Sequence, residues 1–255
     1  MVVTAAAVDA GASPDQIDAI RLGSRRGRLA PMRAPTSPGA VAKDLRAQLL
    51  KRYHARTRRR VPWLQSLALV VLLPLLSLVS RVRVIGRDNI PGGGYIAAAN
   101  HPSNFDALFV ALAIRRRIRF MGKSELFDGR WGWLLNRLGA FPVQRGVWDD
   151  DAFETAATVL KRGRVMSIFP EGGVHRERVP AKSGVGHIAH LAGATVLPLY
   201  LDGTRSLYTP WHWPKVRVVI GAPLQIVEQA QPSREHSQQT AQRILDAIHE
   251  LADRG

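Results

Sequence analysis

The stretch YIAAANHPSNFDALFVALAI, residues 95–114, reads as a strand, a turn and a helix in succession. Residues 95–99 follow the glycine-rich turn PGGG and form a short apolar run, which is typical of a buried strand. Residues 102–114 open with a proline and continue as an apolar run long enough for a helix. A strand that passes through a short turn into a helix is the repeating unit of an α/β fold.

The same alternation continues on either side of this stretch. Further strands are expected at 82–86, 118–123, 140–144, 165–170, 195–203 and 215–221, and further helices at 131–138, 150–162, 185–193 and 234–252. Short links between alternating strands and helices predict an α/β domain with a mostly parallel sheet flanked by helices. Ligands of such sheets bind at the carboxyl ends of the strands, where the turns after 99, 143 and 169 lie.

The chain before this domain is basic. Its first sixty residues hold thirteen Lys and Arg against four Asp. Because residues 1–42 are rich in Ala, Gly, Pro, Ser and Arg, they cannot bury enough apolar surface to offset the cost of ordering, and we expect a disordered basic tail. Residues 43–81 form a basic and hydrophobic anchoring segment, and residues 82–255 form the folded domain.

The segment 63–80 carries no charged residue and is dominated by Leu and Val. As a helix it would cover roughly 27 Å at a rise of 1.5 Å per residue, close to the thickness of a hydrocarbon core. Pro74 lies inside it and would kink or break the helix. The arginines 58–60 beside Trp63 suit an anionic membrane surface. We expect a membrane-associated helix that dips in or spans, with a buried core helix as the alternative.

The formal net charge of +16 indicates an acidic partner, which is nucleic acid, an anionic membrane or a phosphorylated substrate. The absence of cysteine excludes disulfides, thiol nucleophiles and cysteine-ligated zinc. No nucleic-acid-binding module is recognisable, and the aromatic residues are not arranged as a stacking platform. No nucleic-acid partner is therefore expected.

His101 and Asp106 are the first candidates for catalysis. Side chains five residues apart cannot meet if both lie in one helix. Pro102 favours the first helical position, which would make His101 the N-cap with an extended backbone, and its ring could then fold over the first turn onto Asp106. A carboxylate on one ring nitrogen fixes the tautomer and strengthens the other nitrogen as a base. The alternative is a histidine that only caps the helix.

Five sequence blocks in order resemble the glycerolipid acyltransferase family, which includes the bacterial 1-acylglycerol-3-phosphate acyltransferases. The family's NHxxxxD box is matched by NHPSNFD at 100–106. The other blocks are GKSELF at 122–127, GAFPVQRG at 139–146, FPEGGVHRERV at 169–179 and TVLPLYLDGT at 195–204. The resemblance covers roughly residues 80–225 and makes 82–255 an expected acyltransferase domain.

The resemblance implies an O-acyltransferase in which His101 takes the proton of an acceptor hydroxyl as it attacks an acyl thioester. Asp106 would orient His101 and stabilise the imidazolium. The donor would be acyl-CoA or acyl carrier protein, with no metal and no other cofactor. The expected acceptor is a lysophosphatidate-like glycerolipid, so the expected location is the cytoplasmic face of the cell membrane, with membrane lipid as partner.

The same resemblance implies which residues bind the acceptor. Arg145 would hold its phosphate, because a guanidinium can donate two parallel hydrogen bonds to phosphate oxygens. Lys123 is a second cation in a family block. Glu171 would hold acceptor hydroxyls or nearby donors, and Gly172 would let the backbone come close.

The sequence departs from the family after FPEG. Members usually continue with Thr-Arg, and that arginine helps to bind the acceptor, whereas this chain has Gly173-Val174. His175, Arg176 or Arg178 could supply charge from a shifted loop, and Arg176 is the candidate chosen among them. A phosphate-bearing acceptor is therefore less firmly implied than acyl transfer itself. The alternatives are another lyso-lipid or alcohol acceptor, or a membrane-binding protein without catalysis.

Overall fold

In this computed structural model the described residues are 38–60, 62–175, 177–208 and 214–253. The strands are β1 Arg81–Ile85, β2 Tyr95–Ala99, β3 Ile118–Lys123, β4 Ala140–Val143, β5 Val165–Ile168, β6 Thr195–Asp202 and β7 Lys215–Ile220. The α-helices are α3 Pro38–Arg59, α4 Trp63–Val79, α5 Asp106–Ile114, α6 Gly132–Arg137, α7 Asp150–Lys161, α8 Gly184–Ala192 and α9 Arg234–His249. Short 3-10 turns lie at Arg87–Asn89, Ser124–Phe127 and Thr204–Tyr208.

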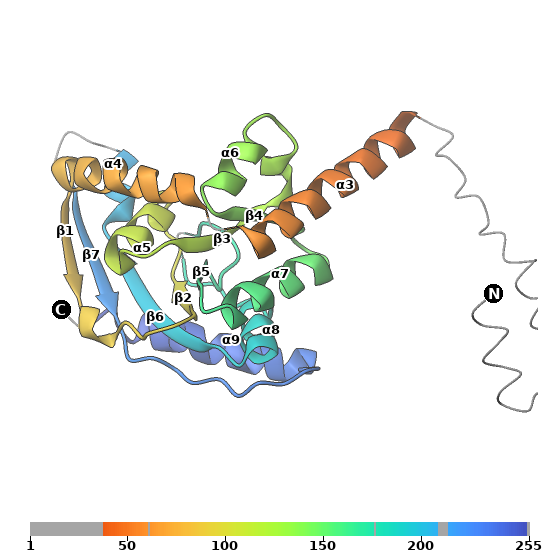
Figure 1. The fold of residues 1–255 in the computed structure, drawn as a ribbon. Helices are drawn as coiled ribbons and strands as arrows, with labels where there is room; N and C mark the ends of the chain where they lie inside the picture. The colour runs from red at the N-terminus through yellow and green to blue at the C-terminus, as the bar shows by residue number, and fades with distance from the viewer. Residues whose placement is uncertain (1–37, 61, 176, 209–213, 254–255) are drawn as a thin grey trace, which may run out of the picture. The chain divides into compact units, whose positions relative to one another are not determined.

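The seven strands form one sheet in the order β1-β7-β6-β2-β5-β3-β4 (Figure 1). All neighbouring pairs are parallel except β6 and β7. The carboxyl ends of β2 to β6 therefore lie at one edge of the sheet, and β1 and β7 run the opposite way. The mostly parallel sheet predicted from the sequence is confirmed.

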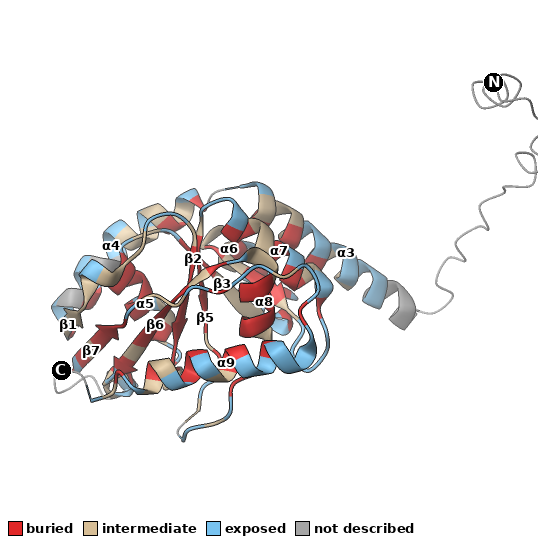
Figure 2. Ribbon diagram, turned by 90° about the horizontal axis from the view of Figure 1, so that it is seen from below, coloured by how far each residue is buried: buried red, intermediate tan, exposed pale blue. Residues whose placement is uncertain are grey.

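The core lies on both faces of the sheet, as alternate residues of β2 show. Ile96 and Ala98 belong to an apolar cluster with α7, α8 and α9, whereas Ala97 and Ala99 belong to one with α4 and α5. This follows from the period of two along a strand. All five β2 residues are buried, and the strands lie between the helices (Figure 2). The predicted flanking by helices is confirmed.

The predicted helix over 102–114 begins later than expected. Helix α5 starts at Asp106, with Phe105 as its N-cap residue, and Pro102 lies in the preceding turn. The interpretation of His101 as the N-cap is therefore wrong. The turn forms because the Asp106 carboxylate binds the backbone N–H of Ser103 at 2.8 Å, which curls the chain before the helix begins.

The predicted division of the chain also differs from the structure. Of the predicted disordered tail 1–42, residues 1–37 lie outside the described residues, and α3 begins at Pro38, so the tail boundary at 42 is wrong. Residues Arg46–Gly255 form one compact unit, with no boundary near 82. The reason is packing: His54 Nδ1 lies 3.0 Å from Thr155 Oγ1, and Leu76 is 8% exposed in the core.

The predicted apolar helix 63–80 is present as the 17-residue α4, and Pro74 does not end it. Within the described ranges, no single helix is long and apolar enough to cross a membrane. The bent pair Lys43–Arg59 and Trp63–Leu76, at 78° to each other, meets the requirement by length and composition alone. Membrane contact by α4 stays a prediction.

Candidate active site

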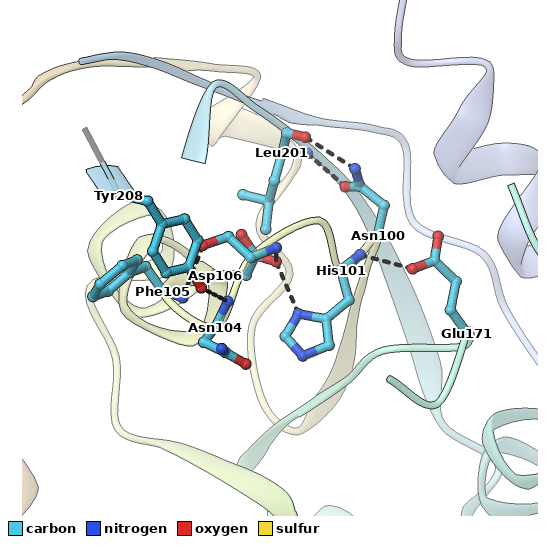
Figure 3. A network of polar contacts seen from close by, with 9 residues as sticks. Asn100, His101, Asn104, Phe105, Asp106, Glu171, Leu201 and Tyr208 are labelled. Atoms are coloured by element: carbon cyan, nitrogen blue, oxygen red, sulfur yellow. Dashed lines mark hydrogen bonds and ion pairs between the residues drawn. The ribbon is translucent and has the colours of Figure 1, made fainter. Parts of the chain in front are cut away.

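Asn100 fixes the point at which the chain leaves the sheet. Strand β2 ends at Ala99, while its parallel neighbour β6 continues to Asp202. The side-chain amide of Asn100 fills the gap, because Nδ2 donates to Leu201 O at 2.9 Å and Oδ1 accepts from Leu201 N at 2.7 Å (Figure 3). The residue that follows, His101, is therefore held at the carboxyl edge of the sheet.

His101 and Asp106 are in contact, as predicted. The Nδ1 atom of His101 lies 2.8 Å from Oδ2 of Asp106, whose side chain is fully buried, whereas that of His101 is 13% exposed. Asp106 is the first residue of α5, where the helix dipole favours a negative charge. An ionised carboxylate only accepts, so Nδ1 carries the proton and Nε2 is left as the basic nitrogen. Within the described ranges no group bonds to Nε2.

Phe169 holds the ring of His101 from one face. The two ring centroids are 3.9 Å apart and the planes are inclined by 10°. Phe169 directly follows β5, which pairs with β2, so both rings leave adjacent strand ends. Sequence reasoning missed this residue, although it opens the FPEG block and stands directly after a predicted strand.

Glu171 binds the backbone of the histidine. Its Oε2 accepts the N–H of His101 at 3.0 Å, and the residue is 5% exposed. Burial raises the pKa of the Glu171 carboxyl above its usual value, and the hydrogen bond from His101 partly opposes this. From the same loop, the backbone N–H of His175 donates to the carbonyl oxygen of His101 at 3.1 Å. The loop after β5 and the turn after β2 are therefore tied together on both sides of His101.

Gly172 is required by the shape of this loop. Its φ is +75°, and its N–H closes a turn on Phe169 O at 2.9 Å. A methyl group on Gly172 would lie 2.6 Å from Cδ of Lys182, so a larger residue would displace that side chain. The predicted tight turn is present. A contact of Gly172 with substrate stays a prediction.

Two basic side chains meet at Gly173. A methyl group placed there would lie 3.4 Å from Nε2 of His175 and 3.7 Å from Nη1 of Arg145. Arg145 is exposed, and within the described part of the chain neither side chain forms an ion pair with a carboxylate. Sequence reasoning placed Arg145 at the site and named His175 only as one of several basic residues nearby.

The other predicted cations are placed differently. Lys123 ends β3, is half exposed, and lies 3.5 Å from Glu125, with which it forms an ion pair. Across the described segments it makes no hydrogen bond to the turn 100–106. Arg176 lies outside the described residues, so its predicted role stays untested.

The known proteins that this chain resembles show its family. A family model described as Acyltransferase matches residues 81–202. The 1-acyl-sn-glycerol-3-phosphate acyltransferase of Bacillus subtilis (strain 168) is 31% identical over 184 residues, which make up 71% of this chain and 92% of that protein. The chain belongs to the glycerolipid acyltransferase family.

Two further relatives agree. A protein of Streptococcus pneumoniae with the same name is 32% identical over 188 residues, covering 72% of this chain and 70% of that one. The crystal structure of the 1-acyl-sn-glycerophosphate acyltransferase PlsC from Thermotoga maritima is similar with a TM-score of 0.54 and 25% identity, covering 84% of this chain and 83% of that one. The acyltransferase described here is thus an O-acyltransferase of phospholipid biosynthesis.

The turn of this acyltransferase has a second support that sequence reasoning missed. Tyr208 accepts the backbone N–H of Asn104 at 3.3 Å on its hydroxyl oxygen, and its ring packs on Phe105 with centroids 5.2 Å apart (Figure 3). Tyr208 lies beyond the last family block, and no local pattern marks it. Leu201, Glu171 and Tyr208 therefore hold the NHPSNFD turn from outside it.

Proposed function

We propose that this acyltransferase is membrane-associated and transfers a fatty acyl group from a thioester to a hydroxyl of a lysophosphatidate-like glycerolipid, with His101 as general base. The observation that carries the proposal is the 2.8 Å contact between Nδ1 of His101 and the buried Asp106. A base held in this tautomer by a buried carboxylate typically contributes about 10²–10⁴-fold to a rate. The names of the relatives support the acceptor class.

The reaction needs no nucleophile from the protein. Nε2 of His101 removes the proton of the acceptor hydroxyl while the oxygen attacks the thioester carbonyl carbon. The tetrahedral intermediate then collapses, the C–S bond breaks, and the imidazolium returns the proton to the departing sulfur. The products are an ester and a free thiol, and Asp106 stabilises the imidazolium in between.

The acceptor's phosphate is assigned to the two basic side chains around Gly173. The guanidinium of Arg145, which can donate two parallel hydrogen bonds to a phosphate, and the imidazole of His175 both lie beside Gly173. Gly173 stands where the family usually has threonine. A side chain at 173 would occupy the space between the two. The absent arginine at 174 is therefore offset by His175 one position later. Glu171 and Gly172 position this loop, and Lys123 is a further candidate at the neighbouring strand end.

A second acceptor class is favoured by one observation. Val174 stands where the family has its arginine, and it is 43% exposed. An exposed apolar side chain beside the site suits a lyso-lipid with less charge or another alcohol. The two acceptor classes differ in whether a phosphate monoester is needed.

The donor and the location complete the proposal. The donor is acyl-CoA or acyl carrier protein, and the enzyme requires no metal or further cofactor. The exposed apolar side of α4 and the basic residues around it support binding to the cytoplasmic face of the cell membrane. Membrane lipid is then both the surface and the source of the acceptor, and no nucleic acid is involved.

The test is acyl transfer by the purified full-length chain in lipid vesicles, with labelled acyl-CoA or acyl carrier protein and a panel of lyso-lipids. We expect His101→Ala to lower transfer by about 10²–10⁴-fold at an unchanged melting temperature. The matched control is His236→Ala, an exposed histidine on α9. Near-normal turnover by His101→Ala would overturn the proposed mechanism.

A further inference from the structure

A cavity of about 740 Å³ lies at the edge of the sheet opposite to His101. It is lined by the start of β3 at Ile118, the start of β5 at Val165 and the first half of α4. His101 and Phe169 stand at the carboxyl ends of β2 and β5, so the cavity and the acyl-transfer site are separated by the length of the strands. Its lining is strongly basic and includes Arg115, Arg116, Arg117, Arg119 and Arg164.

The positive charge of this cavity is not neutralised by the protein. None of its lining residues in the described part of the chain is acidic. Arg119 donates to the carbonyl oxygens of Thr57 and Arg60, and Arg164 donates to Arg60 O at 3.3 Å, so both bind neutral groups at the end of α3. Arg119 is 3% exposed, and its Nε has no partner among the described residues.

The electrostatics agree with this geometry. Burial, with repulsion from Arg164 and Arg56, lowers the pKa of Arg119 to about 10. Burial and the neighbouring Arg162 and Arg117 also lower the pKa of Arg164. Like charges held together in this way are relieved by a bound anion.

The backbone at Arg115 is strained. Arg115 ends α5 in the left-handed conformation with φ 56°, and it is the one non-glycine residue with positive φ in the described ranges. Gly193 ends α8 in nearly the same conformation, with φ 55°, at no such penalty. Arginine thus occupies position 115, although glycine would be less strained there. Backbone strain of this kind is concentrated at functional sites.

The wall of the cavity formed by α4 continues into an exposed apolar stripe. Val70 lines the cavity and is 72% exposed. The other exposed large apolar residues of α4 are Trp63, Leu67, Val71, Leu75 and Leu78, each between 52% and 65% exposed. Their spacing places them along one side of the helix. An exposed apolar stripe that borders a basic cavity is the surface expected to meet an anionic bilayer.

We propose that this arginine cavity binds the phosphate of an anionic phospholipid from the bilayer on which the α4 stripe rests. The ligand's head group contacts the arginines, and its acyl chains leave along the apolar wall at Leu69 and Val70. This is a second lipid site, apart from the acceptor and donor sites of the acyl transfer. It anchors the enzyme and does not depend on the role of His101.

The first experiment measures binding of the full-length chain to vesicles, without acyl donor. Neutral phosphatidylcholine vesicles are compared with vesicles that also contain phosphatidylglycerol. The double variant Arg115→Gly/Arg117→Gln removes two exposed arginines and relieves the strain at 115. Its control, Arg234→Gln/Arg243→Gln on α9, removes the same charge from exposed positions.

We expect the Arg115/Arg117 variant to lose on the order of tenfold or more in affinity for the anionic vesicles, since each basic side chain at such a surface contributes about fivefold. The α9 control and His101→Ala should bind nearly as the wild type does. The basic N-terminal residues contribute equally to all of these proteins. An equal loss in the α9 control would overturn the proposal, because it would reduce the effect to net charge.

The second experiment tests a discrete site. Soluble dihexanoyl phosphatidylglycerol, kept below its micelle concentration, should raise the melting temperature of the wild type in a saturable way, and dihexanoyl phosphatidylcholine should do so much less. The Arg115/Arg117 variant should be at least as heat-stable as the wild type and should not respond. An equal response in wild type and variant would contradict the proposal.

An assay of acyl transfer then separates lipid from CoA as the source of the phosphate. If the arginines bound the phosphates of CoA, the Arg115/Arg117 variant would bind vesicles normally and show a raised KM for acyl-CoA. That result would overturn the lipid site while leaving the acyl-transfer mechanism intact. Failure of the proposed acyl transfer would instead appear in His101→Ala, whose vesicle binding is measured separately.

Discussion

The ring of Phe169 lies flat against the ring of His101, with 3.9 Å between the centroids, while Asp106 holds the same imidazole at its edge. The two contacts restrict different motions. The carboxylate fixes which nitrogen carries the proton, and the phenyl ring fixes the plane in which Nε2 points. A general base needs both, since a small misplacement of the reacting atoms costs much of the rate.

Phe169→Leu should therefore lower kcat by up to about tenfold, because an aromatic pair contributes about 0.5–1.5 kcal/mol beyond its buried area. Phe169→Tyr keeps the stacked ring and should retain most of the rate. The measurement is steady-state acyl transfer with both substrates varied. An unchanged kcat in Phe169→Leu would show that the stacking does not position the base.

Asp106→Asn should lower kcat by about 10²–10⁴-fold with little change in shape. Oδ2 of Asp106 binds both the Ser103 N–H and Nδ1 of His101, so an amide NH₂ group in this position gives up the Ser103 bond, faces Nδ1 as a donor and favours the tautomer with the proton on Nε2. Nitrogen NMR of the His101 ring reads the tautomer directly. Loss of activity without a change of tautomer would contradict this account of Asp106.

Glu171→Gln should change how stability depends on pH. Burial raises the pKa of Glu171, so the folded chain holds this proton more tightly than the unfolded chain. Its contribution to stability therefore falls as pH rises from the ordinary carboxyl value through the raised folded value. Glutamine cannot ionise but still offers an oxygen to the His101 N–H.

The stability of Glu171→Gln relative to wild type should thus be higher at pH 8 than at pH 4, as measured by urea unfolding at both values. The comparison uses the difference between the two proteins, which cancels the titration of groups that they share. A difference that does not change with pH, or that changes in the opposite sense, would show that Glu171 is not destabilised by its burial.

Arg145→Ala and His175→Ala should each raise the KM for a lysophosphatidate acceptor by about tenfold or more, the loss expected for a hydrogen bond to a charged group. The KM for an acceptor without phosphate, such as a monoacylglycerol, should hardly change. His175→Ala keeps the backbone bond to His101, so its effect reports the side chain. Arg83→Ala, an exposed arginine on β1, is the control. Equal losses with both acceptors would argue against a phosphate site at Gly173.

The sequence was sufficient for those parts of the structure that depend on local patterns. The contact of His101 with Asp106 was predicted, although from an N-cap position of His101 that is wrong, and the strands and helices follow from apolar periodicity. The start of α5 did not, because the Asp106 carboxylate binds the Ser103 N–H and competes with an earlier helical turn. Proline at a favoured position was a weaker signal than this hydrogen bond.

Contacts between distant segments were beyond the reach of the sequence. Glu171 was expected to hold acceptor hydroxyls or nearby donors, but the sequence did not show that the donor is the backbone N–H of His101, 70 positions earlier. The packing of Leu76 into the core and the meeting of Arg145 with His175 at Gly173 are of the same kind. Each depends on how strands from different parts of the chain are ordered in the sheet, which short-range patterns do not encode.

The two hydrogen bonds between the Asn100 side chain and Leu201 take the place of a pair of backbone hydrogen bonds. They extend the pairing of β2 with β6 by one residue after β2 has ended. Asn100→Asp would keep an oxygen that accepts the Leu201 N–H but would place its second carboxylate oxygen against the carbonyl oxygen of Leu201. The extra pairing would then be lost. The backbone amides of Leu201 and His101 would then exchange with solvent together. We therefore expect the NHPSNFD turn to open together with the central strands rather than to move independently as a surface loop.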